Sequence, residues 1–180
     1  KHTEKIEKYS IDEAFLDLTD NVKNFKDPLA EASKIAEEIK KEMHTYVGDW
    51  IKCSIGIGPD KLIAKIASDL KKPDGLTVVR PEDKESLYEK LSLTDVPGIG
   101  RQTEKALNIM GIKSLRDLKN FPESKLVVHF GIQGHHLYQM GQLEGSWKED
   151  FAEEGQEDQE ALKSMGHAYT LPVASADAKI

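Results

Sequence analysis

Hydrophobic residues recur along this chain with two different spacings. Over Pro28–Tyr46 and Lys61–Leu70 they return every three or four positions, which predicts two amphipathic helices, the second with Asp60 as its candidate N-cap. Short apolar runs bounded by turn residues predict strands, at residues 6–11, 14–18, 51–57 and 76–79. Residues after about 82 have a helical pattern. The alternation indicates an α+β or α/β core followed by a helical region.

Composition and length are typical of an ordinary globular protein. Of 180 residues, 38% are apolar, which is enough for a hydrophobic core in one domain or two small ones. No apolar stretch approaches the roughly 20 residues of a membrane span, and the first residues lack a signal-peptide pattern. Cys53 is the single cysteine, which excludes an internal disulfide and fits a reducing compartment. We expect a cytoplasmic protein with no membrane partner, in which Cys53 is a core or strand residue.

The net charge of −7 comes from one segment of the chain. Residues 144–161 contain eight acidic residues and the single base Lys148, whereas residues 51–119 contain thirteen Lys and Arg against ten Asp and Glu. The segment 51–119 is therefore compatible with a nucleic-acid partner. The acidic run is typical of an exposed linker that does not pack, and we expect a linker at residues 148–162.

Asp12 and Glu13 are adjacent carboxylates between the first two expected strands. Neighbouring strand positions point to opposite faces, so a metal ion bound by both side chains requires a bend or hairpin tip between the strands. Mg²⁺ prefers oxygen ligands, and transfer of a phosphoryl or nucleotidyl group uses such an ion to neutralise developing charge. The pair is a candidate magnesium site, and the competing interpretation is two solvated turn residues.

Three lysines form a second candidate site. Lys61 and Lys65 are four residues apart and share one face of the second helix, and Lys72 follows that helix just before Pro73. Together they could hold a triphosphate or a nucleic-acid backbone. The alternative is three unrelated lysines on a solvated helix face.

The segment Val96-Pro97-Gly98-Ile99-Gly100 precedes an expected helix that begins at Arg101. Its two glycines allow a tight turn whose backbone can approach a ligand, and the unpaired N–H groups at a helix start favour a phosphate. This is the helix-hairpin-helix pattern, which binds DNA backbone without reading base sequence. Gly98, Ile99, Gly100 and Lys105 form the candidate DNA-binding set, and a tight turn with no ligand is the alternative.

Ser114 is the expected N-cap of the next helix, and residues 130–137 resemble a degenerate second hairpin. His129, His135 and His136 have no carboxylate or cysteine at a suitable spacing, so we interpret them as surface residues rather than metal ligands.

Four short blocks of this sequence together resemble a known protein family in their residues, order and spacing. They are Tyr9-Ser10-Ile11-Asp12-Glu13-Ala14-Phe15-Leu16-Asp17, then Ser54-Ile55-Gly56-Ile57-Gly58 with residues 61–69, then Lys72-Pro73-Asp74-Gly75, and finally Val96-Pro97-Gly98-Ile99-Gly100. In letters, order and spacing they resemble Y-family translesion DNA polymerases of the DNA polymerase IV class. The resemblance extends from about residue 5 to 145.

The resemblance implies an α+β fold with three parts. Residues 1–81 would be the C-terminal portion of a ferredoxin-like palm, with strands packed on two helices. Residues 82–147 would be a small all-helical thumb with the helix-hairpin-helix motif. After the linker, residues 163–180 resemble the start of a little-finger domain.

The resemblance also implies a role for each candidate residue. Asp12 would bind two Mg²⁺ ions, and Glu13 would bind the ion that activates the primer 3′-hydroxyl. Lys72 would contact the triphosphate of the incoming dNTP, with Lys65 beside it. The turn at residues 98–100 would hold a primer-strand phosphate of primer-template DNA, with a monovalent cation at its carbonyls in some members.

The family pattern contains parts that do not precede Lys1 here: an N-terminal strand with another metal-binding Asp, a steric-gate aromatic residue and a fingers domain. We therefore expect template-directed synthesis past damaged bases in the full-length protein, which could also bind the sliding clamp. By itself this chain should be inactive. Two rivals remain open: a non-catalytic DNA-binding scaffold that uses the hairpin, and a nucleotide cyclase with a similar palm.

Overall fold

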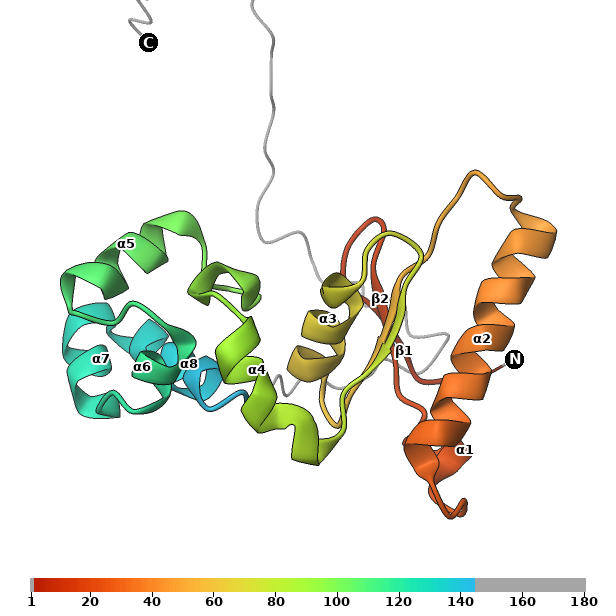
Figure 1. The fold of residues 1–180 in the computed structure, drawn as a ribbon, viewed down its shortest axis with the longest axis horizontal. Helices are drawn as coiled ribbons and strands as arrows, with labels where there is room; N and C mark the ends of the chain where they lie inside the picture. The colour runs from red at the N-terminus through yellow and green to blue at the C-terminus, as the bar shows by residue number, and fades with distance from the viewer. Residues whose placement is uncertain (1, 145–180) are drawn as a thin grey trace, which may run out of the picture.

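The computed structural model describes residues 2–144, which form two groups of elements side by side (Figure 1). The strands are β1 (Ile6–Lys8), β2 (Ala14–Leu16), β3 (Ile55–Ile57) and β4 (Leu76–Val78). The helices of the first group are α1 (Thr19–Val22), α2 (Pro28–Tyr46) and α3 (Lys61–Leu70). Those of the second group are η1 (Pro81–Asp83), α4 (Lys84–Lys90), η2 (Leu93–Asp95), α5 (Arg101–Ile109), α6 (Leu115–Lys119), α7 (Glu123–Phe130) and α8 (Ile132–Gly141).

The strands form two separate two-stranded sheets within residues 2–144. β1 pairs with β2 in antiparallel register, with Glu7 opposite Phe15, and β3 pairs with β4 in parallel. Helices α2 and α3 both contact the parallel pair. The approach of α3 is close, because a Cβ added at Gly56 would lie 2.0 Å from the carbonyl oxygen of Ala64. The α+β class expected from the sequence is confirmed.

Every strand is shorter than expected, and the largest difference precedes β3. The strand expected at 51–57 begins at Ile55, whose N–H donates to the Gly75 carbonyl at 2.9 Å. Earlier residues have no strand beside them, and the Cys53 carbonyl instead accepts a hydrogen bond from Lys40 Nζ at 2.6 Å. Cys53 is only partly buried, so its assignment to a strand or to the core was wrong.

The two long helices begin at side-chain caps. The Asp27 carboxylate accepts from the Ala30 N–H at 3.1 Å, with Pro28 in the first helical position of α2. The Asp60 carboxylate accepts from the Ile63 N–H at 2.8 Å and confirms the expected N-cap of α3. The buried face of α3 then packs on the sheet and toward α4, and it consists of Leu62, Ile63, Ile66 and Ala67.

The second group is built on leucine and isoleucine side chains that are closed to solvent. These are Leu93, Leu107, Ile112, Leu115, Leu118, Leu126 and Leu143. The buried Tyr88 hydroxyl donates to the Gly141 carbonyl at 3.0 Å and joins α4 to the end of α8. Ser114 caps α6 by accepting from the Asp117 N–H at 3.1 Å, as expected from the sequence.

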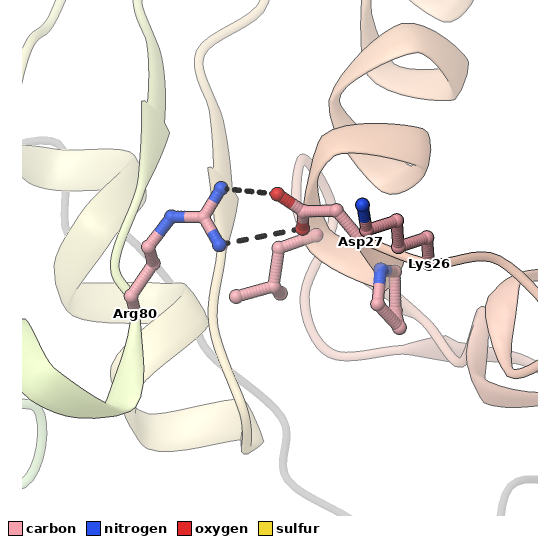
Figure 2. Close-up of a pocket in the computed structure, with 5 residues that line it drawn as sticks. Lys26, Asp27 and Arg80 are labelled. Carbon is pink, nitrogen blue, oxygen red and sulfur yellow. Dashed lines mark hydrogen bonds and ion pairs between the residues drawn. The ribbon is translucent and has the colours of Figure 1, made fainter.

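An ion pair joins the two groups near η1. Figure 2 shows the Arg80 guanidinium facing both carboxylate oxygens of Asp27, at 2.9 and 3.3 Å. Asp27 also caps α2, so one carboxylate holds the helix start and the residue that precedes Pro81. This Arg80 contact lowers the pKa of Asp27 below its ordinary value, and the bond from the Ala30 N–H lowers it further.

The expected acidic linker at 148–162 and the expected little-finger segment at 163–180 lie outside the described residues. Between residues 2 and 144, none of the helices has both the length and the apolar character needed to cross a membrane.

Candidate functional site

The two adjacent carboxylates lie at the tip of the β1–β2 hairpin. The N–H groups of Tyr9 and Ser10 both donate to the Glu13 carbonyl, at 3.0 and 3.1 Å, which closes the turn. Asp12 is exposed and Glu13 is partly buried, and the Ser10 hydroxyl donates to Asp12 Oδ1 at 2.8 Å. The structure places both residues at a hairpin tip between two strands, which is the arrangement that a metal ion bound by both would require.

Helix α3 holds this hairpin through two lysines one turn apart. The Lys61 ammonium forms an ion pair with Glu7 on β1, and both side chains are nearly buried, with 11% and 13% of their surface exposed. One turn later, the Lys65 ammonium forms an ion pair with Glu13 at the tip. Glu7 and Glu13 are therefore held in position relative to α3, and each of them faces a cation.

Lys72 lies beyond the end of α3 and contacts the same network through Asp69. Asp69 Oδ1 lies 2.6 Å from Lys72 Nζ, and Asp69 Oδ2 lies 3.3 Å from Lys65 Nζ. Lys61, Lys65 and Lys72, proposed from sequence as one anion-binding set, thus each have a carboxylate partner. Lys72 is the most open of the three, with 53% of its side chain exposed.

The turn that carries Lys72 is anchored from α2. Lys40 Nζ donates to the carbonyls of Cys53 at 2.6 Å and Asp74 at 2.8 Å, and it also forms an ion pair with the Asp74 carboxylate. Asp74 has a positive φ of 59°, an uncommon conformation that Asp tolerates better than most residues. The Lys40 contacts hold this turn beside the first residues of β3 and β4.

Lys65 and Asp69, at the centre of the network, both have pKa values shifted in favour of their charged forms. Burial lowers the pKa of Lys65, but the Glu13 and Asp69 carboxylates raise it more, and the net shift is upward. Burial raises the pKa of Asp69, but hydrogen bonding and charge from Lys72 and Lys65 lower it more, and the net shift is downward. Both groups therefore stay ionised.

Three residues of this site were missed by the sequence analysis. Glu7 and Lys40 have partners far away in the sequence, so no local pattern marks them. Asp69 had a local signal, because it lies four residues after Lys65 and three before Lys72, which are the spacings of helix ion pairs.

The donor chemistry of Asp12 and Glu13 fits a magnesium ion. Mg²⁺ commonly takes one or two carboxylates and completes its shell with water and substrate phosphate oxygens. Within residues 2–144, no group of three or more His, Cys, Asp and Glu side chains is arranged to hold a metal. The pair thus offers hard oxygen donors, and the Lys65 ammonium, which contacts Glu13 Oε1, would compete with a metal ion for that carboxylate.

A second feature is the turn before α5. Ile99 is buried, and its N–H donates to the Val96 carbonyl at 3.0 Å. Gly98 has a φ of +95°, which favours glycine. Gly100 is the N-cap of α5 without a side-chain cap, and a Cβ added there would have nothing within 4 Å. The first N–H groups of α5 are therefore accessible to a ligand.

Two basic side chains and a cavity lie next to this turn. Arg101 and Lys105 are exposed on α5, so they add to the positive end of the helix dipole. A cavity of about 340 Å³ lies between the turn, α5, α7 and α8. Its lining consists of Gly98, Thr103, Phe130, Gln133, His136, Leu137 and Met140. Elsewhere on α8, His135 Nδ1 forms a hydrogen bond with Glu123 Oε1 on α7, at 2.7 Å.

Two family models match the chain in succession. The impB/mucB/samB family matches residues 1–69, which contain the hairpin and most of α3. The DNA polymerase-iota thumb domain matches residues 94–142, which begin just before the turn at Gly98.

Curated proteins of several organisms are similar to this chain. DNA polymerase IV 2 of Methanosarcina mazei is 39% identical over 137 residues, which are 76% of this chain and 36% of that protein. DNA polymerase IV of Listeria monocytogenes is 40% identical over 138 residues, which are 77% of this chain and 37% of that protein.

Solved structures share the fold. An insertion ternary complex of Dbh DNA polymerase has a TM-score of 0.70 and 34% identity, over 81% of this chain and 41% of that chain. DinB from Sulfolobus solfataricus has a TM-score of 0.69 and 31% identity, over 84% of this chain and 43% of that chain. The chain spans about two-fifths of the length of these relatives.

Proposed function

Because this chain belongs to the Y family of DNA polymerases, we propose that it supplies the hairpin carboxylates and the primer-holding thumb turn of an enzyme that copies past damaged template bases. The observation that carries the proposal is the placement of Asp12 and Glu13 at one hairpin tip, beside the lysines of α3. Primer-template DNA and a dNTP are the proposed substrates.

Asp12 and Glu13 would hold Mg²⁺, with Asp12 shared by two ions. Such ions lower the pKa of an attacking hydroxyl and neutralise charge on a triphosphate and its pyrophosphate leaving group. Asp12 is exposed at the tip and accepts a hydrogen bond from the Ser10 hydroxyl, whereas Glu13 pairs with Lys65. The hairpin thus presents two carboxylates without a change in backbone.

Lys72 would bind the triphosphate of the dNTP. Its side chain is half exposed, its turn is anchored by Lys40, and a compact ammonium suits a phosphate as a point charge. Lys65 is less available for this role, because it lies between the Glu13 and Asp69 carboxylates. We therefore assign Lys72 to contact the nucleotide, whereas Lys65 pairs with Glu13 before nucleotide binds.

The turn at Gly98, Ile99 and Gly100 would hold a primer-strand phosphate. The accessible N–H groups at the start of α5 are oriented donors for a phosphate oxygen. Lys105 would add long-range attraction to the DNA backbone, and a monovalent cation at the turn carbonyls is part of the same proposal. Binding of the sliding clamp and a cytoplasmic location remain predictions from the resemblance.

Primer extension distinguishes this function from a DNA-binding scaffold. In the complete gene product that carries this chain, Asp12→Asn and Glu13→Gln should each abolish extension of a primer while leaving DNA affinity within about twofold, because neither side chain belongs to the DNA-binding turn. Tight, salt-dependent DNA binding by an unmodified protein that never extends a primer would support the scaffold instead.

A further inference from the structure

Four side chains of alternating charge form one series from the hairpin tip to the turn after α3. Glu13 contacts the Lys65 ammonium, Lys65 Nζ lies 3.3 Å from Asp69 Oδ2, and Asp69 Oδ1 lies 2.6 Å from Lys72 Nζ. Lys65 is shared by two carboxylates, and Asp69 is shared by two ammonium groups. Loss of an ion pair at Glu13 or at Lys72 therefore leaves Lys65 or Asp69, respectively, with one partner fewer and favours the contact between those two.

Solvent exposure is lowest at Lys65 and increases from there toward Lys72. Glu13 has 32% of its side chain exposed, Lys65 has 15%, Asp69 has 40% and Lys72 has 53%. An anion that arrives from solvent meets Lys72 first, and Lys65 last. The Lys65 contacts are also the least screened of the series, since screening by water and salt is weaker for partly buried pairs.

The backbone around Lys72 is anchored by hydrogen bonds and close packing. A ligand bound at Lys72 would therefore move side chains rather than the turn itself. Lys40 joins the carbonyls of Cys53 and Asp74, which precede β3 and β4 at the same end of the parallel strand pair. Gly75 also packs tightly, because a Cβ added there would lie 1.9 Å from the carbonyl oxygen of Lys71. The turn that carries Lys72 is thus fixed against the end of α3.

We propose that Asp69 is a positioning residue that couples triphosphate binding at Lys72 to release of Glu13 from Lys65, an inference that rests on the proposed polymerase function. When a triphosphate binds the Lys72 ammonium, Asp69 keeps Lys65 as its remaining partner. Lys65 then shifts from Glu13 toward Asp69. Glu13 becomes available as a metal ligand at the moment when nucleotide is present, and no proton is transferred.

The kinetic test uses the complete gene product and single-turnover nucleotide incorporation. Asp69→Asn should lower the maximal rate about fivefold, the size expected for one partly exposed ion pair, while the apparent Kd for nucleotide stays the same or falls. The Kd does not rise, because a carboxylate near the triphosphate has been removed. Adding Lys65→Met to Asp69→Asn should raise the rate again, since Glu13 then has no competing cation.

A matched variant controls for loss of a helix ion pair in general. Glu31→Gln removes an (i, i+3) partner of Lys34, at 2.7 Å on the outer part of α2, and should leave both kinetic constants unchanged. The proposal is overturned if Asp69→Asn behaves like Glu31→Gln, or if it raises the apparent Kd with no change in the maximal rate.

A second readout does not depend on catalysis. A carbodiimide joins carboxylate and ammonium groups that are in contact, and peptide mapping counts each cross-link. Added dNTP, without divalent metal, should reduce the Glu13–Lys65 cross-link and increase the Asp69–Lys65 cross-link, and Lys72→Ala should prevent both changes. Unchanged cross-links would refute the coupling. A shift of cross-links in a protein that incorporates no nucleotide would support the coupling and refute the polymerase function.

Discussion

The Lys61 ammonium and the Glu7 carboxylate form an ion pair that is almost closed to solvent, and it fastens β1 to the first turn of α3. Lys61 also lies 6.0 Å from the centre of the Phe15 ring on β2, within reach of a cation–π contact. Both strands of the hairpin therefore meet one side chain of α3. The position of the hairpin tip that carries Asp12 and Glu13 depends on this contact, although neither Glu7 nor Lys61 needs to touch a substrate.

Removing one partner of this pair should destabilise the protein more than removing both. Glu7→Gln removes the carboxylate that faces a nearly buried ammonium, so it should lower the free energy of unfolding by about 3 kcal/mol, and Glu7→Gln with Lys61→Met should recover part of that loss. Urea unfolding measures both. Lys34→Met, which breaks the pair with Glu31 at an exposed lysine, is the control and should leave the free energy of unfolding nearly unchanged. Equal losses for the single and double variants would contradict the argument.

The turn before α5 should respond differently to alanine at its two glycines. Gly98→Ala should cost about 1 kcal/mol of stability from its positive φ. The new Cβ should add little, because the Met140 Cε that it would approach at 2.5 Å is the end of a flexible side chain that can move. Gly100→Ala should keep stability, because its Cβ meets nothing within 4 Å. It should nonetheless weaken DNA binding about tenfold by covering the N–H groups that we propose bind a phosphate.

Fluorescence anisotropy at one fixed salt concentration measures this DNA affinity. Gly111→Ala provides the matched control, because Gly111 has a φ of +85° with open space around it. It should therefore lose stability from backbone strain and keep its DNA affinity. If Gly100→Ala binds DNA as well as the unmodified protein does, the α5 turn is not a phosphate site.

Tyr88 gives the fold a dependence on alkaline pH. Burial raises the pKa of Tyr88 to about 12 from 10.0, so the folded protein keeps the proton that the unfolded chain loses first. The stabilising effect of Tyr88 is therefore complete below pH 10 and is lost as the pH rises from 10 to about 12. The drop in unfolding free energy over this range should be smaller in Tyr88→Phe.

The same variant tests the hydrogen bond to Gly141. At neutral pH, Tyr88→Phe removes the donor and leaves the Gly141 carbonyl without its partner, which should lower the free energy of unfolding by about 1–3 kcal/mol. Thermal unfolding at pH 7 measures this loss. Unchanged stability at pH 7 would mean that the hydrogen bond contributes nothing to the joint between α4 and α8.

The elements predicted best from the sequence carry their own local signals. Helix α3 begins and ends where its apolar spacing and the Asp60 cap predict, and Ser114 caps α6 as expected. Strand ends were predicted less well, because a strand extends only where another backbone pairs with it. Residues 51–54 were predicted as strand, yet the backbone that pairs with β3 begins at Gly75, which accepts from the Ile55 N–H, and no backbone between residues 2 and 144 pairs in this way with residues 51–54.

The candidate site was also predicted only where its signal is local in the sequence. Asp12 and Glu13 were found because the hairpin tip is a local feature, and their position there is confirmed. The partner of Lys65 was not found, because Glu13 is 52 residues away in the sequence. Sequence reasoning placed Lys65 beside Lys72 as a triphosphate contact, whereas the folded chain places its ammonium between two carboxylates.

The central claim is that the hairpin carboxylates support nucleotide transfer through Mg²⁺. The most direct measurement is the rate of single-turnover nucleotide incorporation against Mg²⁺ concentration, in the complete gene product with and without Glu13→Gln. The unmodified protein should show a saturable dependence on Mg²⁺, and Glu13→Gln should be about 100-fold slower or more at every concentration. An unchanged rate and Mg²⁺ dependence in Glu13→Gln would contradict the account.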